Sequence, residues 1–208
     1  MAVRMNQEES QFLWQLNLID FAEQFKHPAW GIYHFQRVYN LSLKLADEQN
    51  IDIDQDALFA AAYLHDVGAF QPYKKDGVEH SKRSTQVVEE VLTPLGFPAA
   101  KMSLVKDIIK GHMFYSEPVN KPEAIIFHDA DTLDFMGAIG ITRLLSLIAI
   151  DNWAPDVISA ITLIQKFSKD LPQRLHTLRA REMAKIRQGE MSNYLAALSD
   201  ETSGLQVL

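Results

Sequence analysis

The sequence predicts an all-α fold built as a single helical bundle. Apolar residues recur at three- and four-residue spacing along most of the chain, which is typical of amphipathic helices. No segment shows the two-residue alternation of a strand, and neither a repeat nor a linker divides the chain. We therefore expect one domain over residues 1–208, with roughly seven to ten helices around one core.

The composition supports a globular domain and limits the chemistry of any metal site. Hydrophobic residues make up 47% of the 208 residues and charged residues 23%, which is enough to bury a core without covalent cross-links. There are no cysteines, so disulfides and thiolate ligands are excluded and any metal must be held by His, Asp or Glu. The absence of cysteine also fits our expectation of a cytoplasmic protein.

Charge and hydropathy argue against nucleic acid and membrane as partners. The formal net charge of −7 disfavours a broad nucleic-acid surface. It remains compatible with a small anionic substrate, because a bound metal dominates the field around it. The longest apolar run, residues 138–150, is broken by Arg143 and is shorter than the roughly 20 residues that span a bilayer. The first twenty residues mix polar and apolar side chains, so we expect no secretory signal.

Two amphipathic helices are expected at the start of the chain. Residues 1–25 carry apolar positions at helical spacing and predict a packing helix. Pro28 interrupts this pattern, since the residue before a proline avoids the helical conformation, and it suits the first turn of a second helix over residues 28–49. In that helix His34 and Arg37 are three residues apart and share a face.

The third helix ends in two side chains that are competent to bind metal. It is expected over residues 55–67, with Asp54 as its N-cap. Residues 57–64 are almost all apolar, which indicates a helix buried on most sides. His65 and Asp66 follow at its inner end, where an unpaired charge would be costly.

The rest of the chain is also expected to be helical. The predicted helices cover residues 79–95, 99–111 and 123–133, and then run from residue 141 to the C-terminus with breaks at Pro155 and Pro172. A polar loop over residues 68–78 precedes the first of these helices, and a second loop over residues 113–121 separates the second helix from the third. His80 lies in the first turn of one helix, His112 at the end of the next, and Asp131 near the end of the third.

These elements distribute imidazoles and carboxylates over several helices. Five of the seven histidines fall at helix ends or on helix faces, namely His34, His65, His80, His112 and His128. Four aspartates lie beside or between them: Asp66, Asp129, Asp131 and Asp134. The dipeptide His65-Asp66 alone is weak evidence, but side chains that project inward from several helices are what a metal site in a bundle requires.

Three short motifs together resemble the HD superfamily of metal-dependent phosphohydrolases. Residues 33–38 (Tyr-His-Phe-Gln-Arg-Val) resemble its first motif, residues 60–68 resemble the apolar helix that ends in His-Asp, and residues 130–133 (Ala-Asp-Thr-Leu) resemble its last motif. The match continues through residues 134–141 and is close to a subgroup of small, stand-alone bacterial HD hydrolases. The resemblance implies an HD-type helical bundle with a core at about residues 28–145, flanked by N-terminal and C-terminal packing helices.

The resemblance also implies a set of metal ligands. Matched motif by motif, the ligands of one divalent ion are His34, His65, Asp66 and Asp131. His80 and His112 stand where some HD proteins hold a second ion, with the Asp of the His-Asp pair as a bridge; the alternative is that they contact phosphate beside a single ion. The ion is expected to be Mn, Fe, Co or Ni, with Mg and Zn as further candidates.

The activity implied is hydrolysis of a nucleotide or another small phosphate ester by a metal-activated water. Asp66, His80 and His112 are the expected catalytic residues. The expected substrate-binding residues are Arg37, Lys74, Lys75, Lys82 and Arg83. Each of these assignments has an alternative. Arg37 could pair with a buried carboxylate in place of phosphate, and the basic side chains of the loop could simply be solvated. His128 and Asp129 neighbour the last motif without matching it, and His27 and His176 carry no expected role.

Two other functions compete with a phosphohydrolase. Some HD proteins with six ligands are di-iron oxygenases, and this hypothesis gains weight if both His80 and His112 bind metal. The other is a non-catalytic HD module that senses a nucleotide, although the intact motif set argues against it. An oligomer is compatible with the sequence, which does not specify one.

Overall fold

The computed structural model describes residues 7–150 and 153–208, with side chains from residue 13 onward, and confirms the all-α prediction. The described part holds nine α-helices: α1 (Gln7–Ala22), α2 (Ile32–Asp47), α3 (Gln55–Leu64), α4 (His80–Leu92), α5 (Met102–Lys110), α6 (Pro122–Asp134), α7 (Gly137–Leu145), α8 (Val157–Asp170) and α9 (Leu178–Glu201). Three short 3-10 helices add η1 (Val67–Ala69), η2 (Ala99–Lys101) and η3 (Leu171–Arg174). In these ranges extended pairing is limited to one isolated bridge between Ile148 and Ala154.

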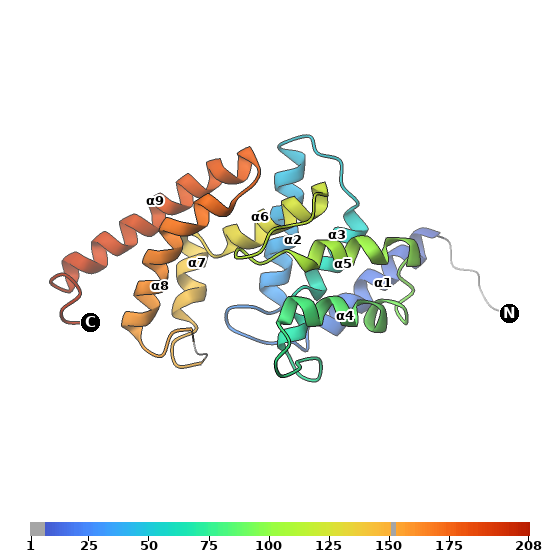
Figure 1. Cartoon of the computed structure of the whole chain (residues 1–208), viewed down its shortest axis with the longest axis horizontal. Coiled ribbons are helices and arrows are strands. Elements are labelled where there is room, and N and C mark those ends of the chain that lie inside the picture. The colour runs from blue at the N-terminus through green and yellow to red at the C-terminus, as the bar shows by residue number, and fades with distance from the viewer. Residues whose placement is uncertain (1–6, 151–152) are drawn as a thin grey trace.

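The helices form two groups that meet along α2 and α6. Figure 1 shows α1, α3, α4 and α5 gathered on one side and α7, α8 and α9 on the other, with α2 and α6 between them. Helix α6 contacts α2, α3 and α5 as well as α7 and α9. One continuous apolar core runs from Trp14 in α1 to Met191 in α9. The residues at the end of α6 are therefore placed where both groups can reach them.

Helix α3 is the buried helix that the sequence predicts. The side chain of Asp54 caps it by accepting a hydrogen bond of 3.0 Å from the backbone N–H of Ala57. Every residue from Ala57 to Leu64 is buried. The helix stops at Leu64, and η1 turns the chain immediately after Asp66. His65 and Asp66 thus lie at a rigid, fully packed helix end.

The boundaries of several helices differ from the sequence-based ones. Helix α2 begins at Ile32 and not at Pro28, because the ring of His27 accepts hydrogen bonds from the backbone N–H groups of Ala29 (3.2 Å) and Trp30 (3.3 Å) and holds this turn out of the helix. The expected first helix includes residues 1–6, which lie outside the described part, and α1 ends at Ala22.

The C-terminal half is divided as expected, but its helices are shifted along the sequence. The breaks at Pro155 and Pro172 are confirmed: the first precedes α8 and the second lies in η3. Helix α7 already begins at Gly137, and α9 continues to Glu201 because Ala180, Ala184 and Met191 anchor one of its faces in the core. Within the described ranges, none of the helices is long and apolar enough to cross a membrane.

Gly68 allows a close approach between the end of α3 and the start of α4. A Cβ at this position would lie 2.3 Å from the carbonyl oxygen of His80 and 2.7 Å from the backbone nitrogen of Ser84. The backbone N–H of Gly68 also donates to the Ser84 hydroxyl over 2.9 Å. Because the atoms in the way belong to backbone, α4 would have to move to admit a side chain.

We therefore expect Gly68→Ala to lower the free energy of unfolding by about 1–3 kcal/mol, the usual cost of overpacking. Urea denaturation followed by circular dichroism measures this change. Gly189→Ala is the matched control, since a Cβ there meets nothing within 4 Å and the residue lies inside α9; it should raise the stability by up to about 1 kcal/mol. Equal effects of the two substitutions would contradict the close approach.

Candidate metal centre

His34 is held in one tautomer by a carboxylate behind it. The residue lies in α2 and is buried. Its Nδ1–H donates to Oδ2 of Asp134 over 2.8 Å. With the proton on Nδ1, the lone pair of Nε2 faces the interior. An imidazole oriented by a carboxylate in this way is the usual arrangement of a histidine metal ligand.

The Asp134 carboxylate is itself fixed by two arginines. Arg37 donates to it from Nε and from a terminal nitrogen, both over 2.9 Å, and Arg143 donates to Oδ2 over 2.9 Å. Arg143 is buried and also donates to the carbonyl of Ala29 over 2.7 Å. Burial raises the pKa of Asp134, but the hydrogen bond from His34 and the charges of the arginines outweigh it and hold the pKa below its ordinary range. Asp134 is therefore an anion that fixes His34.

His65 and His112 have the same orientation, with a backbone carbonyl in place of the carboxylate. The Nδ1–H of His65 donates to Ala62 over 2.8 Å, and that of His112 donates to Ile109 over 2.7 Å. Both side chains are fully buried. Each Nε2 is then an acceptor, and the Nε2 of His112 has no hydrogen-bond partner among the described residues. Such lone pairs, turned toward each other in the interior, require a cation or donors between them.

Four donors surround one point. The Nε2 of His34 lies 3.1 Å from the Nε2 of His65, 3.2 Å from Oδ1 of Asp131 and 3.7 Å from Oδ2 of Asp66. The Nε2 of His65 lies 3.3 Å from the same Asp66 oxygen. Ligands bound at about 2.1 Å and at right angles to each other stand about 3.0 Å apart. The spacing thus fits one divalent ion, and Asp131 Oδ1, buried without a hydrogen-bond partner, supports that fit.

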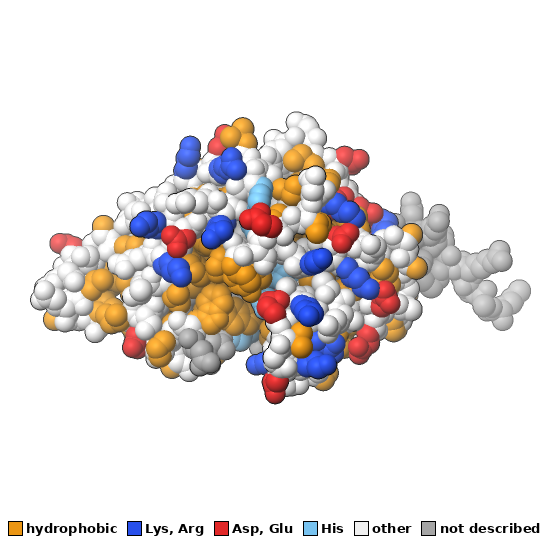
Figure 2. Space-filling model, viewed as in Figure 1, with side chains coloured by type: hydrophobic (Ala, Val, Ile, Leu, Met, Phe, Trp, Pro, Cys, Tyr) orange, Lys and Arg blue, Asp and Glu red, His pale blue; other side chains and the backbone are white. Residues whose placement is uncertain are grey.

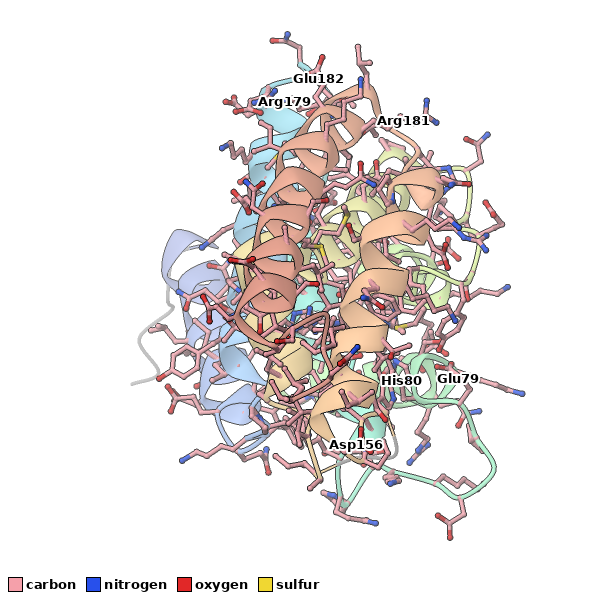
Figure 3. All side chains as sticks on the ribbon, turned by 90° about the vertical axis from the view of Figure 1, so that its left-hand side faces the viewer. Glu79, His80, Asp156, Arg179, Arg181 and Glu182 are labelled. Carbon is pink, nitrogen blue, oxygen red and sulfur yellow. The ribbon has the colours of Figure 1, made fainter. Side chains whose placement is uncertain are left out.

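Two further histidines approach the other oxygen of Asp66. Oδ1 lies 3.2 Å from the Nε2 of His80 and 3.5 Å from that of His112. His80 is the first residue of α4 and pairs through Nδ1 with Oε1 of Glu79 over 2.8 Å; Figure 3 labels both residues there. Asp66 therefore offers one oxygen to each of two donor groups, which is the arrangement of a carboxylate that bridges two ions.

The groups around Asp66 hold its carboxylate in the charged form. Burial raises the pKa of Asp66, but the neighbouring histidines, His65 first, outweigh it and hold the pKa well below its usual range. Burial lowers the pKa of His80, but its hydrogen bonds with Asp66 and Glu79 outweigh burial and raise that pKa to about 10. A positive charge beside Asp66, as a proton on His80 or as a metal ion, is accordingly favoured.

A cavity of about 110 Å³ opens onto these donors. Its described lining combines the metal-competent residues with a largely aromatic wall, and consists of Trp30, His34, Asp66, Ala69, His80, Met113, Asp131, Phe135, Arg143 and Trp153. Trp153 lies nearly parallel to Phe135, at 6.0 Å between ring centres, and 5.6 Å from Trp30. Figure 2 shows apolar side chains gathered near the middle of this face, with histidine visible beside them.

The structure brings together all six sequence-predicted donors but leaves the predicted cations outside the cavity. Lys74, Lys75 and Lys82 are exposed, and Arg83 donates to the carbonyl of Tyr73 over 2.6 Å. None of these four belongs to the described cavity lining. Arg37 takes the alternative role left open by the sequence, since it pairs with the buried carboxylate of Asp134.

Sequence reasoning assigned no role to several residues that complete the site. Asp134 could have been found, because it lies three residues after Asp131 and shares its helix face. Arg143 gave a weaker signal as a lone charge within an apolar run. Trp30 and Trp153 gave none, since they meet only through the tertiary fold.

The fold and the centre together define a helical protein of the His-Asp metal-binding type. The profile of the HD domain matches residues 31–136, half of the chain, and the chain belongs to the HD domain family. HD domains bind divalent metals, and all six donors lie within the matched segment. None of the curated proteins matches the chain.

Several solved structures share the fold. Bacillus subtilis YpgQ in complex with ADP is 23% identical, with 92% of this chain and 100% of that chain covered and a TM-score of 0.70. An HD-superfamily hydrolase from Bacillus thuringiensis is 21% identical over 95% of this chain and 99% of its own, with a TM-score of 0.66. The Lin1889 protein of Listeria innocua is 23% identical over 98% and 99%, with a TM-score of 0.65. At this identity the similarity shows a common fold.

Asp66 presents one oxygen to His34 and His65 and the other to His80 and His112, so its loss affects both sets of donors. We expect Asp66→Ala to abolish metal retention through purification and to leave the helical content nearly unchanged. Elemental analysis and circular dichroism measure the two effects, and Asp76→Ala, in the exposed loop before α4, is the matched control. Metal retained in Asp66→Ala at the level of that control would rule out the assignment.

The variant Arg37→Ala tests whether Arg37 positions a metal ligand or contacts the substrate. If Arg37 acts through Asp134 and His34, Arg37→Ala should weaken metal affinity by about tenfold, as loss of a group that orients a ligand usually does. A residue that contacts phosphate directly would instead raise KM at saturating metal and leave metal affinity unchanged. Metal titration and kinetics on the same preparation separate the two, with Lys82→Ala as the control.

Proposed function

We propose that the chain is a divalent-metal-dependent phosphohydrolase that acts on a nucleotide or another small phosphate ester. The observation that carries the proposal is the position of Asp66, which presents one oxygen to His34 and His65 and the other to His80 and His112 at the wall of a cavity. The fold shared with an HD-superfamily hydrolase supports the hydrolytic assignment.

His34, His65, Asp66 and Asp131 would hold the first ion, and His80 and His112 would hold a second ion through Oδ1 of Asp66. When bound, the metal supplies Lewis acidity, which lowers the pKa of water and polarises a phosphoryl oxygen. The chain contributes the fixed geometry: Asp134 and two backbone carbonyls set the tautomers of His34, His65 and His112 before substrate arrives.

His80 has a different role when only one ion is bound. Glu79 accepts the Nδ1 proton of His80, while Nε2 faces Asp66 and the cavity. A protonated His80 is then placed to donate a proton from Nε2 to the leaving-group oxygen as the P–O bond breaks. With a second ion present, that proton is absent and His80 serves as a ligand. The metal content of the active enzyme decides between the two roles.

The aromatic wall supports a nucleotide as the substrate. Trp30, Phe135 and Trp153 line the cavity together with the metal-competent donors, so a ligand that fills the cavity would contact both kinds of side chain. Aromatic side chains favour planar bases through stacking. Arg143, the arginine in the described lining, already donates to Asp134. The ADP complex of the structurally similar YpgQ agrees with a nucleotide ligand.

The decisive experiment combines elemental analysis of the purified protein with an activity screen. Nucleoside mono-, di- and triphosphates and p-nitrophenyl phosphate are tested with Mn, Co, Ni, Fe and Mg. We expect phosphate or pyrophosphate release that depends on a transition metal and is lost in Asp66→Ala. Metal-loaded protein that binds nucleotides but leaves the whole panel intact would overturn the proposal in favour of a nucleotide-sensing module.

The six-donor arrangement also favours a second candidate, a di-iron oxygenase. His80 and His112 both approach Oδ1 of Asp66, as the ligands of a second ion would. This function predicts two iron ions per chain and oxygen consumption with a substrate, whereas a hydrolase releases phosphate without oxygen. An oxygen electrode and the phosphate assay on one iron-loaded preparation distinguish the two.

A separate prediction concerns Trp30, one of the aromatic residues that line the cavity. Trp30→Ala should raise KM for the best nucleotide about tenfold, because one lost stacking contact costs about 1–3 kcal/mol. It should leave KM for a phosphate ester without a base nearly unchanged, and Trp30→Phe should retain most of the affinity. Equal losses for both substrates would mean that Trp30 shapes the cavity and does not recognise the base.

A further inference from the structure

A second group of metal-competent side chains lies outside the first centre. His128 and Asp129 belong to α6, and His176 lies just before α9. Each of the three offers a ligand atom within 4.8 Å of the others. Asp129 and Asp131 are two residues apart and so point to opposite sides of α6. In Figure 3 the start of α9, marked by Arg179, lies far from Glu79 and His80.

His128 is a buried imidazole whose polar atoms are unsatisfied. The residue is 1% exposed, and neither ring nitrogen has a hydrogen-bond partner among the described residues. Its Nδ1 lies 3.6 Å from Oδ1 of Asp129, too far for a hydrogen bond. Every imidazole carries at least one donor or acceptor that must be satisfied, so this site requires a partner that the described side chains do not supply.

The geometry of this histidine pair matches that of the pairs in the first centre. The rings of His128 and His176 stand 4.9 Å apart at 75°. The rings of His65 and His112 stand 4.9 Å apart at 80°, and those of His34 and His65 stand 5.0 Å apart at 67°. An edge-on arrangement is compatible with two imidazoles that direct nitrogens at one ion, as proposed for His34 and His65 in the first centre.

Asp129 supplies a buried negative charge to the same site. Its two oxygens accept the backbone N–H groups of His176 and Thr177, each over 2.8 Å. The residue is fully buried, and its one ion-pair partner among the described side chains is His128. Each oxygen retains a lone pair for a cation. Glu117, on the loop before α6, brings a second carboxylate within 3.8 Å of the Nε2 of His176.

We propose that His128, Asp129 and His176 form a second divalent-metal site, with Glu117 as the ligand on its solvent side. Two imidazoles and one or two carboxylates suit a borderline-soft transition ion such as Zn²⁺. Bound metal would fasten the start of α9 and the loop before α6 to α6 itself. This inference does not depend on the proposed hydrolase activity.

His176→Ala is the sharpest test, because it separates the metal from the structural role of this turn. Asp129 contacts the backbone of residue 176, so the substitution removes the imidazole and leaves the N–H that Asp129 accepts. The side chain is exposed, and the variant should fold. Chelator-stripped protein is titrated with ZnCl₂ by calorimetry, and the melting temperature is recorded with and without zinc.

The titration uses wild type, His176→Ala, Asp66→Ala and the double variant, with Glu182→Gln on α9 as the control. We expect His176→Ala to lose one zinc equivalent in both backgrounds, or to bind it at least about tenfold more weakly. It should also lose the zinc-dependent rise in melting temperature, and His128→Leu should lose the same equivalent. Unchanged zinc uptake in His176→Ala would overturn the proposal. The ring nitrogens of His128 would then be hydrogen-bonded to buried water.

Discussion

The interaction on which the rest of the site depends is the contact of Asp134 with three positive or polar partners. The carboxylate lies at the end of α6 and receives hydrogen bonds from His34 and Arg37 in α2 and from Arg143 in α7. Each partner alone would be an expensive burial, and together they neutralise one another. The cluster joins α2, α6 and α7 and fixes the ring of His34. The same carboxylate therefore orients a metal-competent histidine and links the helices around it.

The donors are precise because they stand at helix ends that the core immobilises. His65 and Asp66 follow α3, His80 opens α4 and His112 follows α5. At these helix ends His65 and His112 each donate from Nδ1 to the backbone carbonyl three residues earlier, which fixes their tautomer. The convergent helix ends thus position the donors and fix the protonation of two of the rings. Gly68 permits the close packing on which this convergence depends.

The sequence predicted the helical class, and the six side chains that it singled out as donors converge in the structure, because helical periodicity and the HD motifs are local signals. It did not predict the start of α2, where the ring of His27 competes with the helix for the N–H groups of Ala29 and Trp30. The expected role of the loop cations rested on charge alone, whereas the cavity wall consists of residues such as Trp30 and Trp153, distant in sequence and apolar. Tertiary contacts of that kind leave no local pattern.

The two walls of the cavity come from different parts of the chain. All six donors fall within residues 31–136, the segment shared with the HD domain, whereas Arg143 and Trp153 lie beyond it. The candidate donors are thus encoded within the shared segment, whereas part of the remaining cavity lining is encoded outside it. Change in the C-terminal helices and their connections can alter what the cavity admits without disturbing a single donor. Such a division makes this fold well suited to acquire new substrates while it keeps one reaction centre.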